Sequence, residues 1–279
     1  MRLERFSDVG HFEARVQSFL LEREAVHNLM LGIIGHLHSG TVKDPLMATV
    51  ERGGEIQLVA LRTPPHPLIL SLPTTEEALD TLASALGSSE FPGVNGPAEV
   101  VVAFTRRWAA VTGQRARLYS SQRIYQLNRV VPMAGVQGNA REVHEGDRSV
   151  VVPWSSAFVE EALPDDPHDP HAWFDRFLGP EPRTLFVWEV EGELVSMAAA
   201  GGPTPNGDRI SWVYTPPALR GRGYASACVA ALSQRLLDSG RRFCFLYTDL
   251  ANPTANNLYQ RIGYRQVIDA SIYHFEDPE

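Results

Sequence analysis

Cysteine is scarce in this chain, and long hydrophobic runs are missing from it. Only two cysteines occur among 279 residues, Cys228 and Cys244, and both lie in apolar segments without the spacing of a metal site. They are expected to be free buried thiols in a reducing cytoplasm, which excludes a disulfide framework. No apolar run is long enough for a transmembrane helix, and residues 1–6 contain no apolar signal region. The composition therefore predicts a cytoplasmic globular protein with no membrane partner.

Positive charge is not in excess either. The formal net charge is −8, which argues against a nucleic-acid partner but leaves room for one local basic site. The nine histidines form no metal-binding pattern. His168 and His171 stand in the run Pro-Asp-Asp-Pro-His-Asp-Pro-His, which is interpreted as a polar loop. No metal site is predicted.

A basic, glycine-rich segment follows a short apolar strand. Residues 210–214 are strand-like and lead into Thr-Pro-Pro and then Arg-Gly-Arg-Gly-Tyr-Ala at residues 220–225. An amphipathic helix follows, with apolar residues three and four apart, and Gly240 ends it. A loop of this kind at a helix N-terminus binds anions, commonly phosphate, through backbone N–H groups. The alternative is an ordinary strand-to-helix turn with a solvated arginine pair.

A second pattern lies further along the chain. Residues 243–250 have the composition of a strand. Asn252 is a plausible N-cap, and Pro253 stands at the first helical position, where proline is favoured. Gly263 ends this short helix, and another strand begins at Tyr264.

Together the two segments resemble a known family. The pattern Arg-x-x-Gly-x-Ala from Arg220, followed by Asn-Pro-Thr-Ala-Asn-Asn-Leu-Tyr from Asn252, is similar to the GNAT superfamily of acyl-CoA-dependent N-acetyltransferases. The resemblance covers about the last half of the chain. It implies acetyl-CoA as the acyl donor and a small amine or amino-acid-like molecule as the acceptor.

The resemblance also implies roles for individual residues. The coenzyme A pyrophosphate would be held by the loop and the helix start, namely Arg220, Gly221, Arg222, Gly223, Tyr224, Ala225 and Ser226. The pantetheine arm would pair with the backbone of Val213, Tyr214 and Thr215, and would bond to Asn252 and Asn256. Tyr259 matches the tyrosine that protonates the departing thiolate; otherwise it is an aromatic on the core face of its helix.

The general base is not assigned. An alkyl ammonium group has a pKa near ~10 and must lose a proton before its nitrogen attacks the thioester in a ternary complex. Many relatives carry a glutamate on the strand before the loop, but this strand offers Ser211, Trp212 and Tyr214. Asp249, Glu160, Glu161 and a water relay are the alternatives, and each carboxylate is equally explained as a solvated or structural group.

The expected fold is α/β (α+β), with two GNAT-like domains over residues 1–134 and 135–279. Each is expected to hold a mixed, mostly antiparallel sheet flanked by helices. The second half should contain a strand within 143–153, helices over 155–163 and 171–178, and a hairpin over 184–201. The first half should contain helical residues 11–38, a helix over 75–86 and a strand over 99–104. The closing strands are similar, Ile-Tyr-Gln-Leu at 124–127 and Ile-Tyr-His-Phe at 272–275.

The first half lacks the basic loop. The equivalent position reads Leu-Pro-Thr-Thr-Glu-Glu at residues 72–77, and carboxylates repel phosphates. We therefore expect this half to bind no acyl-CoA, and the oligomeric state is not predicted. Two other functions stay open: a tandem enzyme with a specialised acceptor, similar to mycothiol synthase, and a non-catalytic acyl-CoA-binding module.

Overall fold

The computed structural model describes residues 1–133, 135–163, 168–179 and 183–277. Contacts divide the chain into two compact units. The first contains Met1–Tyr125, Tyr247–Pro253 and Gln266–Glu279, and the second contains Gln126–Leu246 and Thr254–Arg265. The second unit therefore starts earlier than the expected range 135–279, and two late segments belong to the first unit. Each unit is described by itself.

The first unit contains most of the elements that precede residue 128. In chain order they are β1 (Arg2–Phe6), α1 (Val9–Leu21), α2 (Glu24–Leu37), β2 (Leu46–Arg52), β3 (Glu55–Arg62), β4 (Leu68–Leu70), α3 (Glu77–Leu86), β5 (Gly93–Pro97), α4 (Ala98–Thr112) and β6 (Arg115–Leu127). Most of the last strand, β12 (Arg265–Glu276), belongs to this unit as well.

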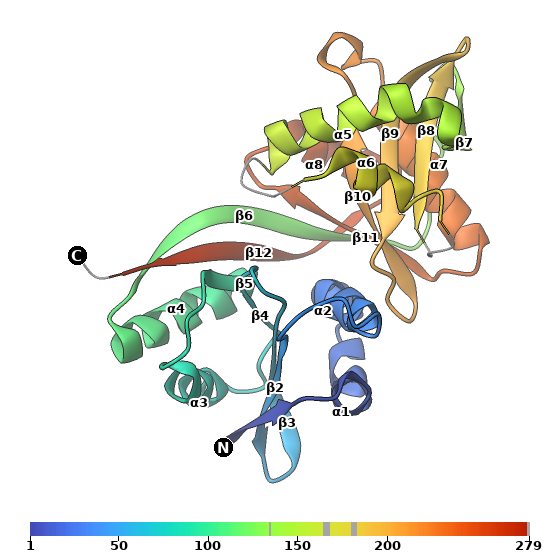
Figure 1. Cartoon of the computed structure of the whole chain (residues 1–279). Coiled ribbons are helices and arrows are strands. Elements are labelled where there is room, and N and C mark those ends of the chain that lie inside the picture. Colours follow the sequence, from blue (N-terminus) through green and yellow to red (C-terminus); the bar gives the residue numbers. More distant parts are fainter. Residues whose placement is uncertain (134, 164–167, 180–182, 278–279) are drawn as a thin grey trace. The chain divides into compact units, whose positions relative to one another are not determined.

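The first unit is built on a sheet with the strand order β1-β2-β3-β4-β5-β12-β6 (Figure 1). β4 and β5 are parallel, whereas β1 to β4 pair antiparallel in succession and β12 pairs antiparallel with β5. Alternate strand residues face opposite sides, so the sheet is buried on both. One side packs on α3 and α4 around Phe104 and Trp108, and the other packs on α1 and α2 around Phe12 and Met30.

The second unit follows the same principle. Its elements are β7 (Asn139–Glu142), the 3-10 turn η1 (Glu145–Asp147), α5 (Arg148–Ala162), α6 (Pro170–Asp175), β8 (Thr184–Val190), β9 (Glu193–Gly201), β10 (Gly207–Tyr214), η2 (Pro217–Leu219), α7 (Tyr224–Asp238), the first residues of β11 (Phe243–Asp249) and most of α8 (Pro253–Ile262). The strand order is β11-β10-β9-β8-β7, with β10 and β11 parallel and the other pairs antiparallel.

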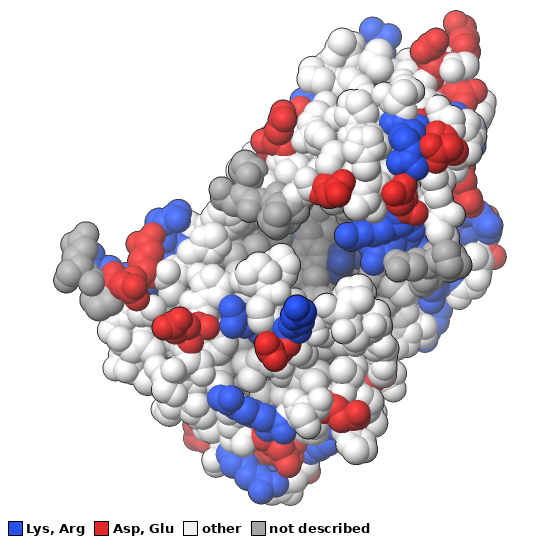
Figure 2. Space-filling model, viewed as in Figure 1, with Lys and Arg blue, Asp and Glu red and all other residues white. Residues whose placement is uncertain are grey.

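Two layers of helices enclose this second sheet. α5 and α6 cover the face turned to the viewer in Figure 1, where Val151, Trp173 and Phe174 pack on alternate residues of β8 and β9. α7 contacts β8, β9 and β10 and lies behind these strands (Figure 1). The fold is thus mixed α/β with a mostly antiparallel sheet, as predicted. Acidic and basic side chains lie beside each other at several places on the face shown in Figure 2.

Two strand predictions are wrong. Residues 99–104 belong to helix α4, because Val101, Thr105 and Trp108 recur at helical spacing and are buried together. The expected strand within 143–153 is mostly the first half of α5, which continues through Pro153. The expected helix over 11–38 is divided into α1 and α2 near Arg23.

Both cysteines are free and buried, as predicted. Burial raises the pKa of the Cys228 thiol, and it raises that of Cys244 to about 12. Across the described ranges, no helix combines the length and the apolar character needed to cross a bilayer.

Candidate active site

An irregularity in β10 marks the candidate site. β10 pairs with β9 up to Ser211 and again at Tyr214, so Trp212 and Val213 together face one residue of β9. Trp212 has a φ of 53°, in the left-handed region that bulky residues rarely adopt. The parallel pairing with β11 covers Gly207–Ile210 and ends there. The end of β10 is therefore bulged on one edge, and its pairing to β11 stops on the other.

The predicted loop and helix follow this strand. After η2 the chain turns through Gly221 and Gly223, whose φ values are 80° and 85°. Only glycine adopts this region without a steric penalty, so both glycines are required by the turn. α7 then begins at Tyr224 with no side-chain cap from Gly223 and no acidic residue in its first turn. Its first backbone N–H groups and the positive end of its dipole suit an anion such as phosphate.

Arg220 fastens this loop to the rest of the second unit. Its guanidinium donates to Glu161 of α5 over 2.7 and 2.9 Å, and its Nε donates to the Thr215 carbonyl over 2.9 Å. The Ser196 hydroxyl of β9 donates to the Tyr214 carbonyl over 2.9 Å and lies 2.8 Å from the Thr215 hydroxyl. These contacts hold the loop in one conformation, and they engage the carbonyl groups of Tyr214 and Thr215 within the protein.

The predicted acid, Tyr259, lies on the buried face of α8. Its side chain is 8% exposed, and its ring meets that of Tyr264 edge-on, with the centroids 5.9 Å apart. Burial raises the pKa of Tyr259 to about 12. The phenol therefore keeps its proton at neutral pH, as a proton donor must. Asn252 stands directly before α8 and Asn256 is half-buried within it.

The three candidate bases are all exposed carboxylates. Glu160 and Glu161 lie at the end of α5, and Glu161 is paired with Arg220. Asp249 accepts a hydrogen bond of 2.7 Å from the Ala251 N–H and so supports the turn before α8. Glu161 therefore has a structural role in the salt bridge and Asp249 has one in the turn, and none of the three carboxylates is assigned as the base.

Aromatic side chains surround the bulge on the α5–α6 side, and the sequence reasoning missed them. The Trp212 ring lies 4.9 Å from Phe158, 5.2 Å from His168 and 4.7 Å from Trp173, measured between centroids. Trp154 lies 6.2 Å from Tyr214 in the same way. The only signal in the sequence is the i, i+4 spacing of Trp154 and Phe158 on α5, because the other members are far apart in the chain.

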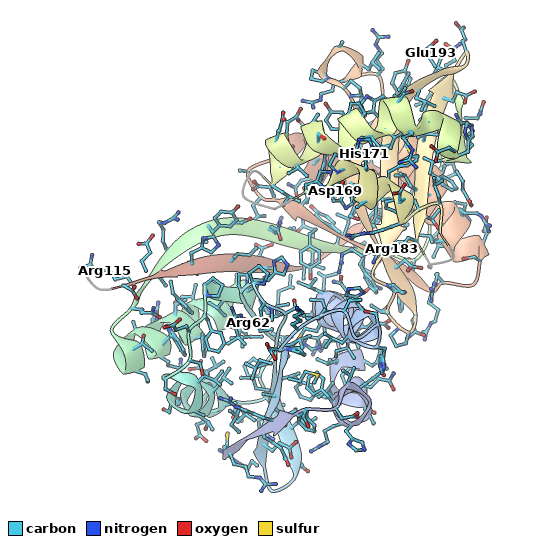
Figure 3. All side chains as sticks on the ribbon, in the orientation of Figure 1. Arg62, Arg115, Asp169, His171, Arg183 and Glu193 are labelled. Carbon is cyan, nitrogen blue, oxygen red and sulfur yellow. The ribbon has the colours of Figure 1, made fainter. Side chains whose placement is uncertain are left out.

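His168 and His171, predicted to lie in a polar loop, have different surroundings. His168 is half-buried in the aromatic cluster, whereas His171 is exposed at the start of α6, beside the helix cap Asp169 (Figure 3). The first four residues of this run, 164–167, lie outside the described part. Within the described part, no group of three or more His, Cys, Asp or Glu side chains is arranged to hold a metal ion.

Known proteins resemble this chain in sequence and in fold. Residues 150–264 match the family model described as the acetyltransferase (GNAT) family. The chain is 30% identical over 102 residues to an acetyltransferase of Pectobacterium atrosepticum, covering 36% of this chain and 70% of the relative.

Solved structures match over nearly the whole length. An acetyltransferase from the GNAT family of Colwellia psychrerythraea has a TM-score of 0.58 at 13% identity and covers all of both chains. A GCN5-related N-acetyltransferase of Kribbella flavida has a TM-score of 0.59 at 16% identity, covering 91% of this chain and 96% of its own. A Drosophila protein reaches 0.67 at 12% identity, with 98% of each chain covered. At these identities the matches establish the fold alone.

Proposed function

Because the chain belongs to the GNAT acetyltransferase family and is therefore an acyltransferase, we propose that it transfers the acetyl group of acetyl-CoA to the amine of a small acceptor. The observation that carries the proposal is the arrangement at the end of β10. There a bulged strand leads through two left-handed glycines to a helix N-terminus with no side-chain cap and no acidic residue in its first turn.

The donor would be held by the chain's own backbone. The N–H groups at Gly221, Gly223 and the start of α7 bind the pyrophosphate, with Arg222 adding charge. In this proposal Arg220 also positions the loop, because its guanidinium is bonded to Glu161 and to the Thr215 carbonyl. The backbone at Val213, in the bulge, is offered to the pantetheine arm and to the thioester oxygen, where negative charge develops.

Proton transfer completes the proposed reaction. The amine attacks the thioester carbon after losing a proton to a base or a water relay, and the carbon–sulfur bond breaks. Tyr259 then donates its proton to the departing sulfur. The phenol of Tyr259 is protonated throughout the neutral range, because burial raises its pKa further above that range.

We also propose that the two halves are diverged copies of one domain and that only the second binds the donor. Both halves follow the order strand, two helices, three strands, helix, strand, helix, strand. The helices that correspond in this order, α3 and α7, differ in charge at their N-termini. α3 carries Glu77 and Asp80 in its first turn, whereas the first turn of α7 has no acidic residue. Carboxylates at the α3 terminus disfavour a phosphate there.

Replacing Gly223 with alanine tests the loop. The added Cβ would lie 3.1 Å from Cγ2 of Val136, and the left-handed backbone costs about 1–2 kcal/mol for a non-glycine residue. We expect the dissociation constant of acetyl-CoA, measured by calorimetry, to rise by about tenfold or more.

The matched control is Gly240→Ala at the other end of α7. Gly240 also has a positive φ, 100°, but a Cβ there meets open space. This variant should lose similar stability and keep its affinity for acetyl-CoA. Equal affinity of both variants for acetyl-CoA would refute the loop assignment. Acetyl transfer to amines from labelled acetyl-CoA then separates an enzyme from a module that only binds the donor.

A further inference from the structure

Three of the chain's five tryptophans gather around the bulge of β10. The side chains of Phe158, His168 and Trp212 form the outer part of this cluster and are half-buried. We call these three the aromatic surface. Trp173 lies beneath it, 6% exposed, with its ring 4.7 Å from Trp212 and 6.1 Å from His168.

The aromatic surface lies outside the fully buried core of the second unit. Beneath it, Trp173 and Phe174 already pack on Leu185 and Val187 of β8, and all four are buried. Phe158 and Trp212 are attached to this layer and stay partly accessible. Ligand sites are lined mainly by hydrophobic and aromatic side chains, so accessible rings beside the bulge suit a binding role.

The backbone of Trp212 points to the same conclusion. A left-handed conformation at a residue other than glycine costs of the order of 1–3 kcal/mol and tends to occur at functional sites. Here it lies within the bulge, directly before Val213, whose backbone is offered to the proposed donor, and the indole of Trp212 lies on the α5–α6 side.

The two faces of the sheet in the second unit are covered by different helices. In the proposed function the donor phosphates bind at the N-terminus of α7, which packs behind β8 to β10, whereas α5 and α6 cover the other face of the sheet. We place the acceptor on this second face, where the aromatic surface lies beside the bulge. An acceptor on that side meets the aromatic surface before it reaches the bulge.

The polar groups nearby are already engaged with protein partners. The Ser155 hydroxyl donates to the Val152 carbonyl over 2.8 Å, so its oxygen accepts from Nε2–H of His168 over 3.0 Å. This hydrogen bond orients the imidazole ring. Glu161, one turn after Phe158 on α5, is neutralised by Arg220. With these two groups engaged, the ring faces are the main feature that the aromatic surface itself offers an acceptor.

We propose that the aromatic surface binds the body of the acceptor and that the acceptor is a primary amine carrying a planar, apolar group. This inference rests on the proposed acetyltransferase function and narrows its substrate class. Phe158 and Trp212 stack on or pack against the planar group, and the amine reaches past them to the bulge. Trp173 acts as a positioning residue, because it supports Trp212 from below.

The test compares two primary alkyl amines, 2-phenylethylamine and n-butylamine, with labelled acetyl-CoA. We expect kcat/KM for 2-phenylethylamine to exceed that for n-butylamine by about tenfold or more, chiefly through KM. Phe158→Leu, which keeps an apolar side chain but removes the ring, should reduce this ratio to below about threefold. The dissociation constant of acetyl-CoA should stay unchanged.

Phe104→Leu is the matched control. Phe104 is fully buried in α4 of the first unit and takes no part in the aromatic surface, so this variant should lose stability and keep the ratio. A ratio near one in the natural protein, or an unchanged ratio in Phe158→Leu, overturns the inference and leaves the proposed function intact. Binding of acetyl-CoA with no transfer to any member of a panel of small amines overturns both.

Discussion

At the scale of single residues, Tyr259 is the side chain with the most definite chemical expectation. It is buried on α8, and its pKa is raised to about 12. If it protonates the departing sulfur, Tyr259→Phe should lower kcat by about 10²- to 10³-fold. The affinity for acetyl-CoA should change little, because the ring and its packing remain.

Tyr264→Phe is the control for Tyr259. The Tyr264 hydroxyl lies 2.8 Å from the Ser233 hydroxyl, inside the second unit. Its loss should cost about 1 kcal/mol of stability and leave kcat unchanged. Equal kcat values for Tyr259→Phe and the natural protein would remove Tyr259 from the reaction.

His27 is a second residue with a measurable signature, in this case on stability. It is 3% exposed in α2; its Nδ1 donates to the Leu20 carbonyl and its Nε2 accepts from the Leu72 N–H. Burial lowers its pKa from 6.5 to about 4. Both nitrogens are engaged by the neutral ring, so protonation breaks the contact with Leu72.

The sign of the pH dependence follows from this lowered pKa. Between pH 6.5 and 4 the unfolded chain binds the proton and the folded chain does not, so stability is complete above 6.5 and is lost as the pH falls. The loss should reach roughly 3 kcal/mol by pH 4. The free energy of unfolding, measured with urea at a series of pH values, should fall more steeply with decreasing pH for the natural protein than for His27→Gln over this interval. Parallel curves would contradict the assignment.

At the scale of elements, the contact between α5 and the loop before α7 is the feature to test. Glu161 and Arg220 are roughly half exposed, so their salt bridge should contribute no more than about 1 kcal/mol. Glu161→Gln should therefore raise the dissociation constant of acetyl-CoA by less than about fivefold. The fall in rate that protonation of a general base causes at low pH, the acidic limb of the pH–rate profile, should still be present in this variant.

A general base would behave differently. If Glu161 removes the proton from the amine, its replacement should lower the rate by about 10²- to 10⁴-fold and abolish that limb. Glu160→Gln and Asp249→Asn, measured in parallel, test the two other carboxylates. A small effect in all three variants would favour a water relay.

The elements show where sequence reasoning was sufficient. The strand, loop and helix around Gly221 and Gly223, and the helix that begins at Pro253, could be predicted because glycine, proline and apolar spacing act locally. The first half of α4 was taken for a strand because its β-branched run resembles one, and only a short helix near residues 106–112 was predicted, whereas the buried face from Val101 to Trp108 follows the helical period. α5 was missed in part because proline usually ends helices and Pro153 does not.

Long-range contacts explain the rest. The aromatic surface joins residues of α5, β10 and the segment before α6, and no local pattern connects them. The salt bridge between Glu161 and Arg220 spans 59 residues in the chain. The sequence alone was sufficient to predict the order of the loop and helix motifs, but it did not predict which side chains contact them.

At the scale of the whole molecule, the chain does not divide into two continuous pieces. Most of β12, the last strand in the sequence, belongs by its contacts to the first unit. It pairs with all of β5, from Ala270 opposite Pro97 to His274 opposite Gly93. Phe275 stacks on Trp108 at 5.2 Å, and Arg123 forms a salt bridge of 2.6 Å with Asp269.

This arrangement predicts that residues 1–134, the range proposed as a domain from sequence, do not fold alone. Without β12 the fragment leaves β5 without its antiparallel partner and uncovers Trp108. An unpaired strand edge and an exposed aromatic ring both destabilise the folded fragment. Trp108 is the only tryptophan within residues 1–134, so its fluorescence reports on this unit. The fragment should show exposed emission and no cooperative unfolding, and joining residues 265–279 to it by a flexible linker should restore both buried emission and a cooperative transition. A cooperative transition with buried emission in the bare fragment would show that β12 is dispensable and that the sequence-based boundary is adequate.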